Sequence, residues 1–106
     1  MTIFIFDVNN RITSTSGAIE YVVGGLPFGA GGALVIADGV AEPTHVHNGW
    51  PTNAAGKIAV EVGGTTVITQ NGLPLSANGR IVTDNTNPVE GFSNGLPYTA
   101  NGLSIA

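Results

Sequence analysis

The chain has 106 residues, of which 42% are apolar and only 9% are charged, and its net charge is −4. Three cationic side chains are too few for the basic surface that nucleic acids or anionic lipids require, so neither partner is expected. The lack of cysteine excludes disulfides, thiolate catalysis and cysteine-ligated zinc. The length and the low charge predict one folded domain spanning residues 1–106, with no cofactor.

The first predicted element is a hairpin near the start of the chain. Its turn is centred on adjacent asparagines, a pair that tolerates the left-handed backbone conformation. The register predicted for this hairpin pairs Phe6 with Ile12 and Asp7 with Arg11. The segment before it meets an acid directly and has no basic residues, so no secretion signal is expected there.

The following segments are predicted as short strands separated by loops. Residues 18–23 and 65–69 are rich in β-branched and aromatic side chains, and residues 33–37 are apolar throughout. The proline-containing segments 41–43 and 85–88 are predicted as loops. Sixteen glycines and six prolines interrupt the chain too often for long helices. We therefore expect roughly eight to ten short strands and no helix.

An internal repeat covers most of the chain. Copies begin near residues 25, 49, 72 and 95, and each follows the pattern Gly, Leu or Trp, Pro, two variable residues, Ala, one variable residue, Gly. A decayed first copy begins near residue 6. The prolines favour extended backbone before them, and the glycines mark turns, so each copy predicts a hairpin.

The repeat also predicts the register of its hairpins. A three-residue loop over residues 77–79, with Gly79 in the left-handed conformation, pairs Leu75 with Ile81, and the same register pairs Phe28 with Leu34. In the last copy a two-residue turn at Asn101 and Gly102 is predicted instead, which pairs residue 98 with residue 105. These elements predict an all-β fold, a small sandwich or barrel-like domain built from hairpin repeats of ~23 residues.

Four side chains occupy one equivalent position of the repeat: Leu26, Trp50, Leu73 and Leu96. We interpret them as packing or interface residues. Trp50 replaces a leucine, which favours packing over exposure. The alternative is a sugar-binding platform made by Trp50 and Tyr98, because aromatic faces stack on carbohydrate.

No catalytic or metal site is predicted. His45 and His47 would share one face of a strand, but Glu42 is the only nearby third ligand, and two surface histidines in a loop explain the pair as well. The acids are scattered along the chain, and there is no Gly-x-Ser-x-Gly motif. The protein is therefore not expected to be an enzyme.

The repeats resemble a pattern found in small virion proteins of tailed bacteriophages. Residues 71–82, Asn-Gly-Leu-Pro-Leu-Ser-Ala-Asn-Gly-Arg-Ile-Val, and residues 94–103 are similar to the Gly-Leu-Pro-x-x-Ala-x-Gly-x-Leu repeats of those proteins. The resemblance covers most of the chain after residue 24 and implies a virion structural protein without catalytic residues. Capsid decoration, or cement, proteins of this size are commonly all-β and bind as oligomers across contacts between capsid subunits.

The resemblance therefore implies a virion location, with the major capsid protein or other virion proteins as partners. A tail, portal-associated or fibre component is the alternative, and a carbohydrate-binding adsorption module is a further one. Short hairpins with few surface charges leave strand edges and apolar patches that need covering. Homo-oligomerisation is accordingly expected.

Overall fold

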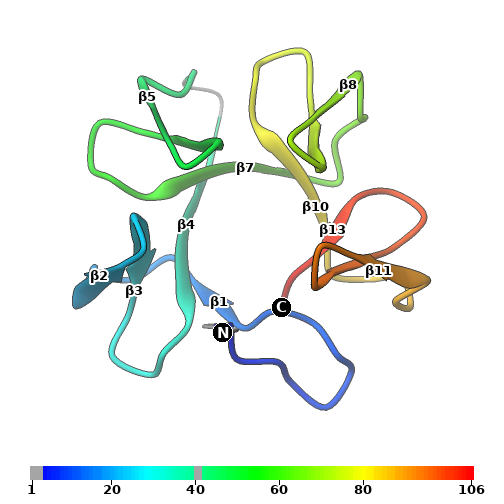
Figure 1. The fold of residues 1–106 in the computed structure, drawn as a ribbon, viewed down its shortest axis with the longest axis horizontal. Coiled ribbons are helices and arrows are strands. Elements are labelled where there is room, and N and C mark those ends of the chain that lie inside the picture. Colours follow the sequence, from blue (N-terminus) through cyan, green and yellow to red (C-terminus); the bar gives the residue numbers. More distant parts are fainter. Residues whose placement is uncertain (1–3, 40–41) are drawn as a thin grey trace.

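The computed structural model describes residues 4–39 and 42–106, and each repeat in it folds into three short strands (Figure 1). We call them the outer, middle and inner strands of units 2 to 5, and the decayed first copy is unit 1. The outer strands are β2 (Tyr21–Val23), β5 (His45–His47), β8 (Ile68–Gln70) and β11 (Gly91–Ser93). The middle strands are β3 (Leu26–Phe28), β6 (Trp50–Thr52), β9 (Leu73–Leu75) and β12 (Leu96–Tyr98). The inner strands are β4 (Leu34–Asp38), β7 (Ile58–Val62), β10 (Ile81–Asp84) and β13 (Leu103–Ser104), with β1 (Ser14–Thr15) as the inner strand of unit 1.

The hairpins between middle and inner strands have the predicted register in all but the last unit. Phe28 pairs with Leu34, Leu75 pairs with Ile81, and Phe6 forms an antiparallel bridge with Ile12. A polar side chain in the repeat stabilises several of these turns. The Asn53 Oδ1 atom, for example, accepts hydrogen bonds from the backbone of Ala55 and Lys57 at 2.9 and 3.0 Å.

The register predicted for the last hairpin is wrong. Tyr98 pairs with Leu103, not with Ile105, and the Thr99 amide donates to the Gly102 carbonyl at 2.8 Å. The turn is a two-residue one, as predicted, but it lies one residue earlier in the chain. This register keeps Leu103, which is 1% exposed, at the core position that Leu34 and Ile81 occupy in other units.

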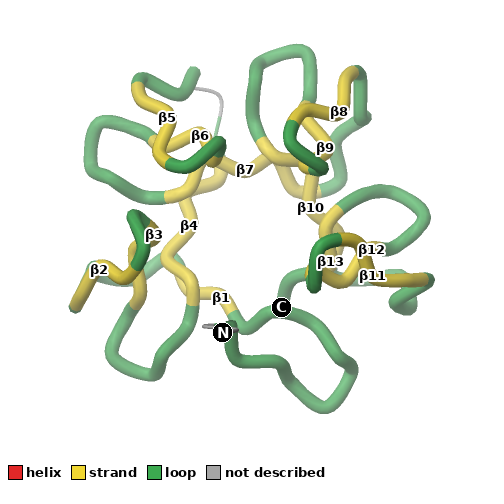
Figure 2. Tube along the Cα trace, in the orientation of Figure 1, coloured by secondary structure: helices red, strands yellow, loops and turns green. Residues whose placement is uncertain are grey.

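The inner strands form a ring of parallel pairs around the molecular axis (Figure 2). In the junctions of β4 with β7, β7 with β10 and β10 with β13, the third residue of one inner strand lies opposite the first residue of the next, as in the pairs Ile36 with Ile58 and Val60 with Ile81. Ile105 and Ile12 pair in the same register and join the two ends of the chain. The sheet is thus one curled, mixed sheet of 13 strands with five lobes and extents of 30 × 30 × 22 Å.

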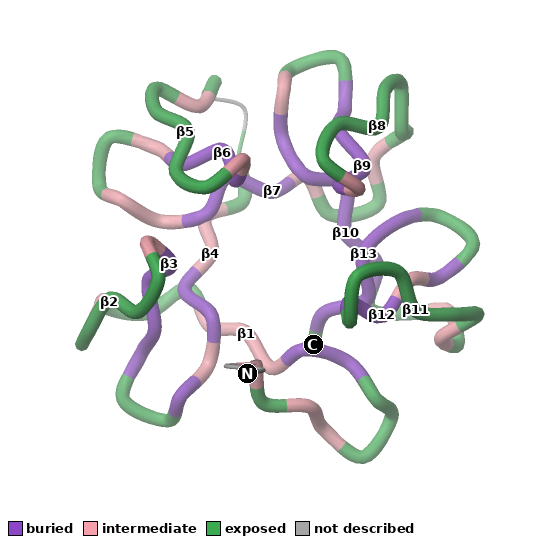
Figure 3. Tube along the Cα trace, viewed as in Figure 1, coloured by how far each residue is buried: buried purple, intermediate pink, exposed green. Residues whose placement is uncertain are grey.

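The core lies between the middle strands and the inner ring. Buried side chains from all five units form one hydrophobic cluster, and in Figure 3 the mostly purple strands β7, β10 and β13 contrast with the green, exposed outer strands. Phe4 packs against this cluster, with its ring centroid 5.9 Å from that of Trp50 and 6.5 Å from that of Phe28. Phe4 therefore holds the unit 1 position that is equivalent to Leu26 in unit 2.

The all-β prediction is confirmed, and the curled sheet corresponds to the barrel-like alternative. The expected eight to ten strands are too few, because each repeat contains a second hairpin that was not predicted. The strands expected at 18–23 and 65–69 begin later, at Tyr21 and Ile68. The loop at 85–88 is confirmed, whereas the loop expected at 41–43 lies partly outside the described residues. Residues 4–39 and 42–106 contain no helix that could cross a membrane.

Candidate functional site

The outer strands form the most exposed surface of the molecule, and we call β2, β5, β8 and β11 together the outer-strand surface. Every residue in these four strands is exposed, whereas the middle strands beside them are almost entirely buried. The strands carry no Asp, Glu, Lys or Arg. This surface therefore has uncharged residues where a soluble domain usually carries charges.

A tight turn of two residues positions each outer strand. Asn48 and Gly49 have φ angles of 52° and 84°, and Asn71 and Gly72 have 54° and 79°. Positive φ at both positions is the type I′ turn, whose twist matches that of paired strands. The Asn48 side-chain amide also donates to the Gly24 carbonyl in the preceding unit, which links neighbouring turns. The turns of the outer strands β2 and β5 are thus tied to each other.

The centre of each outer strand lies opposite the proline of its middle strand. Val22, Val46 and Phe92 occupy this position in three units, and they are 63%, 68% and 58% exposed. Thr69 occupies it in the fourth unit. Within the described ranges, no strand pairs with the outward edge of any outer strand. Such edges readily accept another chain, and soluble proteins usually protect them with charges.

Grooves of similar composition separate neighbouring units. Three of them have volumes of about 340, 410 and 370 Å³. Each is lined by the proline and the turn glycine of one unit and by side chains of the next, as with Pro27, Gly25 and His47 in the first groove. The lining residues include no acid, lysine or arginine. The grooves therefore offer shape together with apolar and uncharged polar contacts.

The buried carboxyl group of Asp84 has a structural setting. Asp84, which is 4% exposed, accepts hydrogen bonds from the Thr86 amide at 2.9 Å, the Asn87 side chain at 2.7 Å and the Thr99 hydroxyl at 2.8 Å. Burial alone raises the pKa of Asp84, but these hydrogen bonds outweigh it and hold the pKa well below the usual range. A carboxylate held ionised in this way stabilises the loop after β10 and is a poor proton donor.

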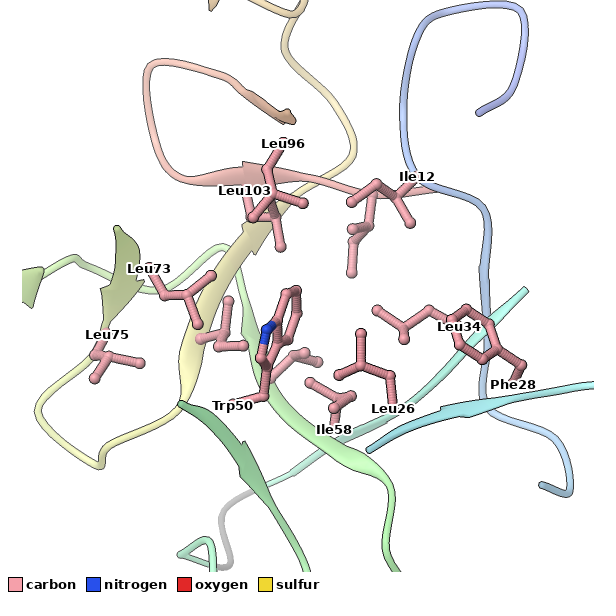
Figure 4. Close-up of a cluster of buried hydrophobic side chains, with 13 residues drawn as sticks. Ile12, Leu26, Phe28, Leu34, Trp50, Ile58, Leu73, Leu75, Leu96 and Leu103 are labelled. Carbon is pink, nitrogen blue, oxygen red and sulfur yellow. The ribbon is translucent and has the colours of Figure 1, made fainter. Parts of the chain in front are cut away.

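The structure brings the four predicted packing residues together. Leu26, Trp50, Leu73 and Leu96 belong to the central hydrophobic cluster, where Figure 4 shows their side chains converging. Trp50 is 8% exposed, so its ring faces are not available for stacking on a sugar. The Tyr98 side chain is half-buried, and its hydroxyl donates to the Gly72 carbonyl at 2.5 Å. The two residues do not form an exposed aromatic platform.

The two histidines lie on the outer-strand surface. His45 and His47 share one face of β5 with their ring centroids 6.2 Å apart, and the His45 Nδ1 atom lies 2.9 Å from the Thr44 hydroxyl. Among the described residues, no group of three or more His, Asp or Glu side chains is placed to hold a metal ion, so Glu42 does not complete a site. The pair contributes to the exposed surface of β5.

Sequence reasoning missed the central residues of the outer strands. Asn-Gly pairs precede three of the four middle strands, and Gly24-Gly25 precedes the first. These dipeptides are the strongest local signal for a two-residue hairpin, and they would have placed a strand before each of them. The comparisons with known proteins add no further candidate, since no family model, curated protein or solved structure matches this chain.

Proposed function

We propose that this protein is a non-enzymatic structural component of a tailed-bacteriophage virion, a capsid decoration protein that docks on the shell through its outer-strand surface. The observation that carries the proposal is the fourfold presentation of a short, exposed, uncharged strand with a free edge. Repetition of one contact element suits binding to a lattice of identical subunits. The resemblance of the Gly-Leu-Pro repeats to those of small virion proteins of tailed bacteriophages supports the choice of a virion as the assembly.

Several weak contacts of this kind add up when they are held in a rigid frame. The parallel inner ring and the linked turns fix the relative positions of the outer strands, so one engaged strand raises the effective concentration of the others. The apolar centres Val22, Val46 and Phe92 supply buried area on docking. Low charge means that such docking carries little electrostatic cost and little dependence on salt.

Purified shells that lack the protein provide the test. We expect the added chain to bind at a stoichiometry close to the number of capsid subunits and to raise the temperature at which filled particles release their DNA. Unchanged thermal and osmotic resistance of saturated particles would refute the cementing role. Binding of only a few copies per particle would instead place the protein in the tail, portal or fibre, which is the alternative location.

A further inference from the structure

Within residues 4–39 and 42–106, unit 1 lacks one element that the other four units have. Its residues Phe4, Ile5 and Phe6 occupy the middle-strand positions that Leu26, Pro27 and Phe28 occupy in unit 2, as shown by the equivalent pairing of the last residue of each with an inner strand. Units 2 to 5 each cover the outward edge of the middle strand with an outer strand. Within residues 4–39 and 42–106, no strand covers the outward edge of Phe4–Phe6.

One hydrogen bond marks this difference. In each complete unit, the last residue of the middle strand accepts a hydrogen bond from the segment that leads into the outer strand. The pairs are Glu20 N with Phe28 O, Thr44 N with Thr52 O, Val67 N with Leu75 O and Glu90 N with Tyr98 O, at 2.7–2.9 Å. The equivalent acceptor in unit 1 is the Phe6 carbonyl, which receives no hydrogen bond from the described residues.

The exposure of the side chains agrees with a missing neighbour. Ile5 is 48% exposed, whereas Pro27 at the same position in unit 2 is buried. Phe4 and Phe6 are only half-buried, although their equivalents Leu26 and Phe28 are buried in the core. The inner side of unit 1 is complete, because the Thr13 amide donates to the Ile5 carbonyl at 2.8 Å and Ile12 pairs with Ile105. In unit 1, among the described residues, only the outward edge of Phe4–Phe6 therefore lacks a neighbouring strand.

We propose that the outward edge of Phe4–Phe6 is an acceptor site for an extended segment of another polypeptide chain, which adds as the fifth outer strand by antiparallel β-augmentation. The four complete units define the ligand: three extended, uncharged residues with a β-branched or aromatic residue at the centre in all four cases. The backbone amide of the residue directly before these three donates to the Phe6 carbonyl. The side chain of the central residue lies opposite Ile5. This site does not depend on which assembly the protein joins.

A peptide with the sequence of residues 18–25, blocked at both ends, is the probe. It carries the β2 strand and the Glu20 amide that serves the equivalent carbonyl in unit 2. We expect saturable binding to the full chain at one peptide per molecule, with NMR shift changes at Phe4–Phe6. Methylation of the Glu20 nitrogen should weaken binding about tenfold, since it removes one hydrogen bond and adds a clash.

The matched control is the same peptide methylated on the Val22 nitrogen. Val22 lies opposite Pro27 in a pair that does not exchange hydrogen bonds, so its amide points away from the acceptor edge. This peptide should bind like the unmodified one. Equal weakening by both methylations, or shift changes only at the outer strands of units 2 to 5, would overturn the proposal.

A variant that supplies its own fifth strand gives an independent test. Residues 1–3 are replaced by Met followed by Ile-Thr-Gln-Asn-Gly, the sequence of residues 68–72, which places a type I′ turn directly before Phe4. We expect a higher Tm than for the wild-type chain and no peptide binding. An extension of the same length made of Gly and Ser should leave both unchanged. Undiminished peptide binding by the self-complemented variant would contradict the acceptor site.

Discussion

The inner and outer strands of this protein come from the same repeat, yet they have opposite environments. The inner strands β4, β7, β10 and β13 pair on both sides, and residues such as Ile58, Ile81 and Val82 are fully buried. The outer strands pair on one side only, and every one of their residues is exposed. The comparison separates two roles: the ring determines the fold and its stability, and we propose that the outer strands, whose sequences are free to vary, serve binding.

The repeat sequence itself reflects this division. Positions in the inner strands keep large aliphatic residues in every unit, as in Leu34, Ile58, Ile81 and Leu103. The outer strands range from Tyr-Val-Val to His-Val-His, Ile-Thr-Gln and Gly-Phe-Ser. Because the exposed strands have no packing requirement to meet, their sequences diverge while the turns that orient them remain similar.

The largest expected effect is the difference in unfolding free energy between two valine-to-alanine substitutions, one at a buried and one at an exposed position. Val82→Ala in the inner ring removes a fully buried side chain and should lower the free energy of unfolding by about 2–3 kcal/mol. Val46→Ala on β5 removes a side chain that is 68% exposed and should change it by less than about 0.5 kcal/mol. Denaturant titration of the two variants measures both values. Similar losses of unfolding free energy in the two variants would contradict the separate roles of the ring and the outer strands.

A second comparison uses two glycines in turns between middle and inner strands. The shorter last turn brings Gly102 against β10, where an added Cβ would overlap the Val82 carbonyl oxygen and lie 3.0 Å from its carbon. Gly102→Ala should therefore destabilise the protein by about 1–3 kcal/mol. Gly31→Ala meets no atom within 4 Å, does not require positive φ, and should be neutral or slightly stabilising. Thermal unfolding distinguishes the two.

The buried carboxylate predicts a pH effect within the ring. The pKa of Asp84 lies well below its ordinary value near 3.8, so the folded state favours the ionised form more than the unfolded state does. Its contribution to stability should be fully present above about pH 4 and should decline as the pH falls below that value. Asp84→Asn should be less stable at pH 7 and should lose less stability between pH 4 and pH 2. An equal loss of stability between pH 4 and pH 2 in the wild-type protein and the variant would contradict this role.

Much of the ring follows from short-range signals. The Gly-Leu-Pro pattern and the turn glycines predict the middle–inner hairpins, because a three-residue loop with a left-handed glycine leaves little choice of register. The register of the last hairpin was predicted wrongly, because its loop is one residue shorter and only the burial of Leu103 decides the register. The burial of Trp50 is consistent with its place at a leucine position of the repeat.

The outer strands β5 and β11 and the ring closure were not predicted, for different reasons. Strands such as His45–His47 have no alternation of buried and exposed residues, so only the Asn-Gly turns signal them. The pairing of Ile12 with Ile105 joins residues at opposite ends of the chain, and no local pattern specifies it. It completes a ring of five parallel junctions with equivalent registers, which is a property of the whole ring.

The most direct test of the account is shell binding by a chain whose outer strands have lost their apolar centres. The variant carries Val22→Ser, Val46→Ser and Phe92→Ser, and the control carries Val8→Ser, at a 98% exposed position outside the outer strands. We predict that both variants fold with a Tm close to that of the wild type, that the control cosediments with capsid shells, and that the triple variant does not. Wild-type binding by a folded triple variant would contradict docking through the outer-strand surface.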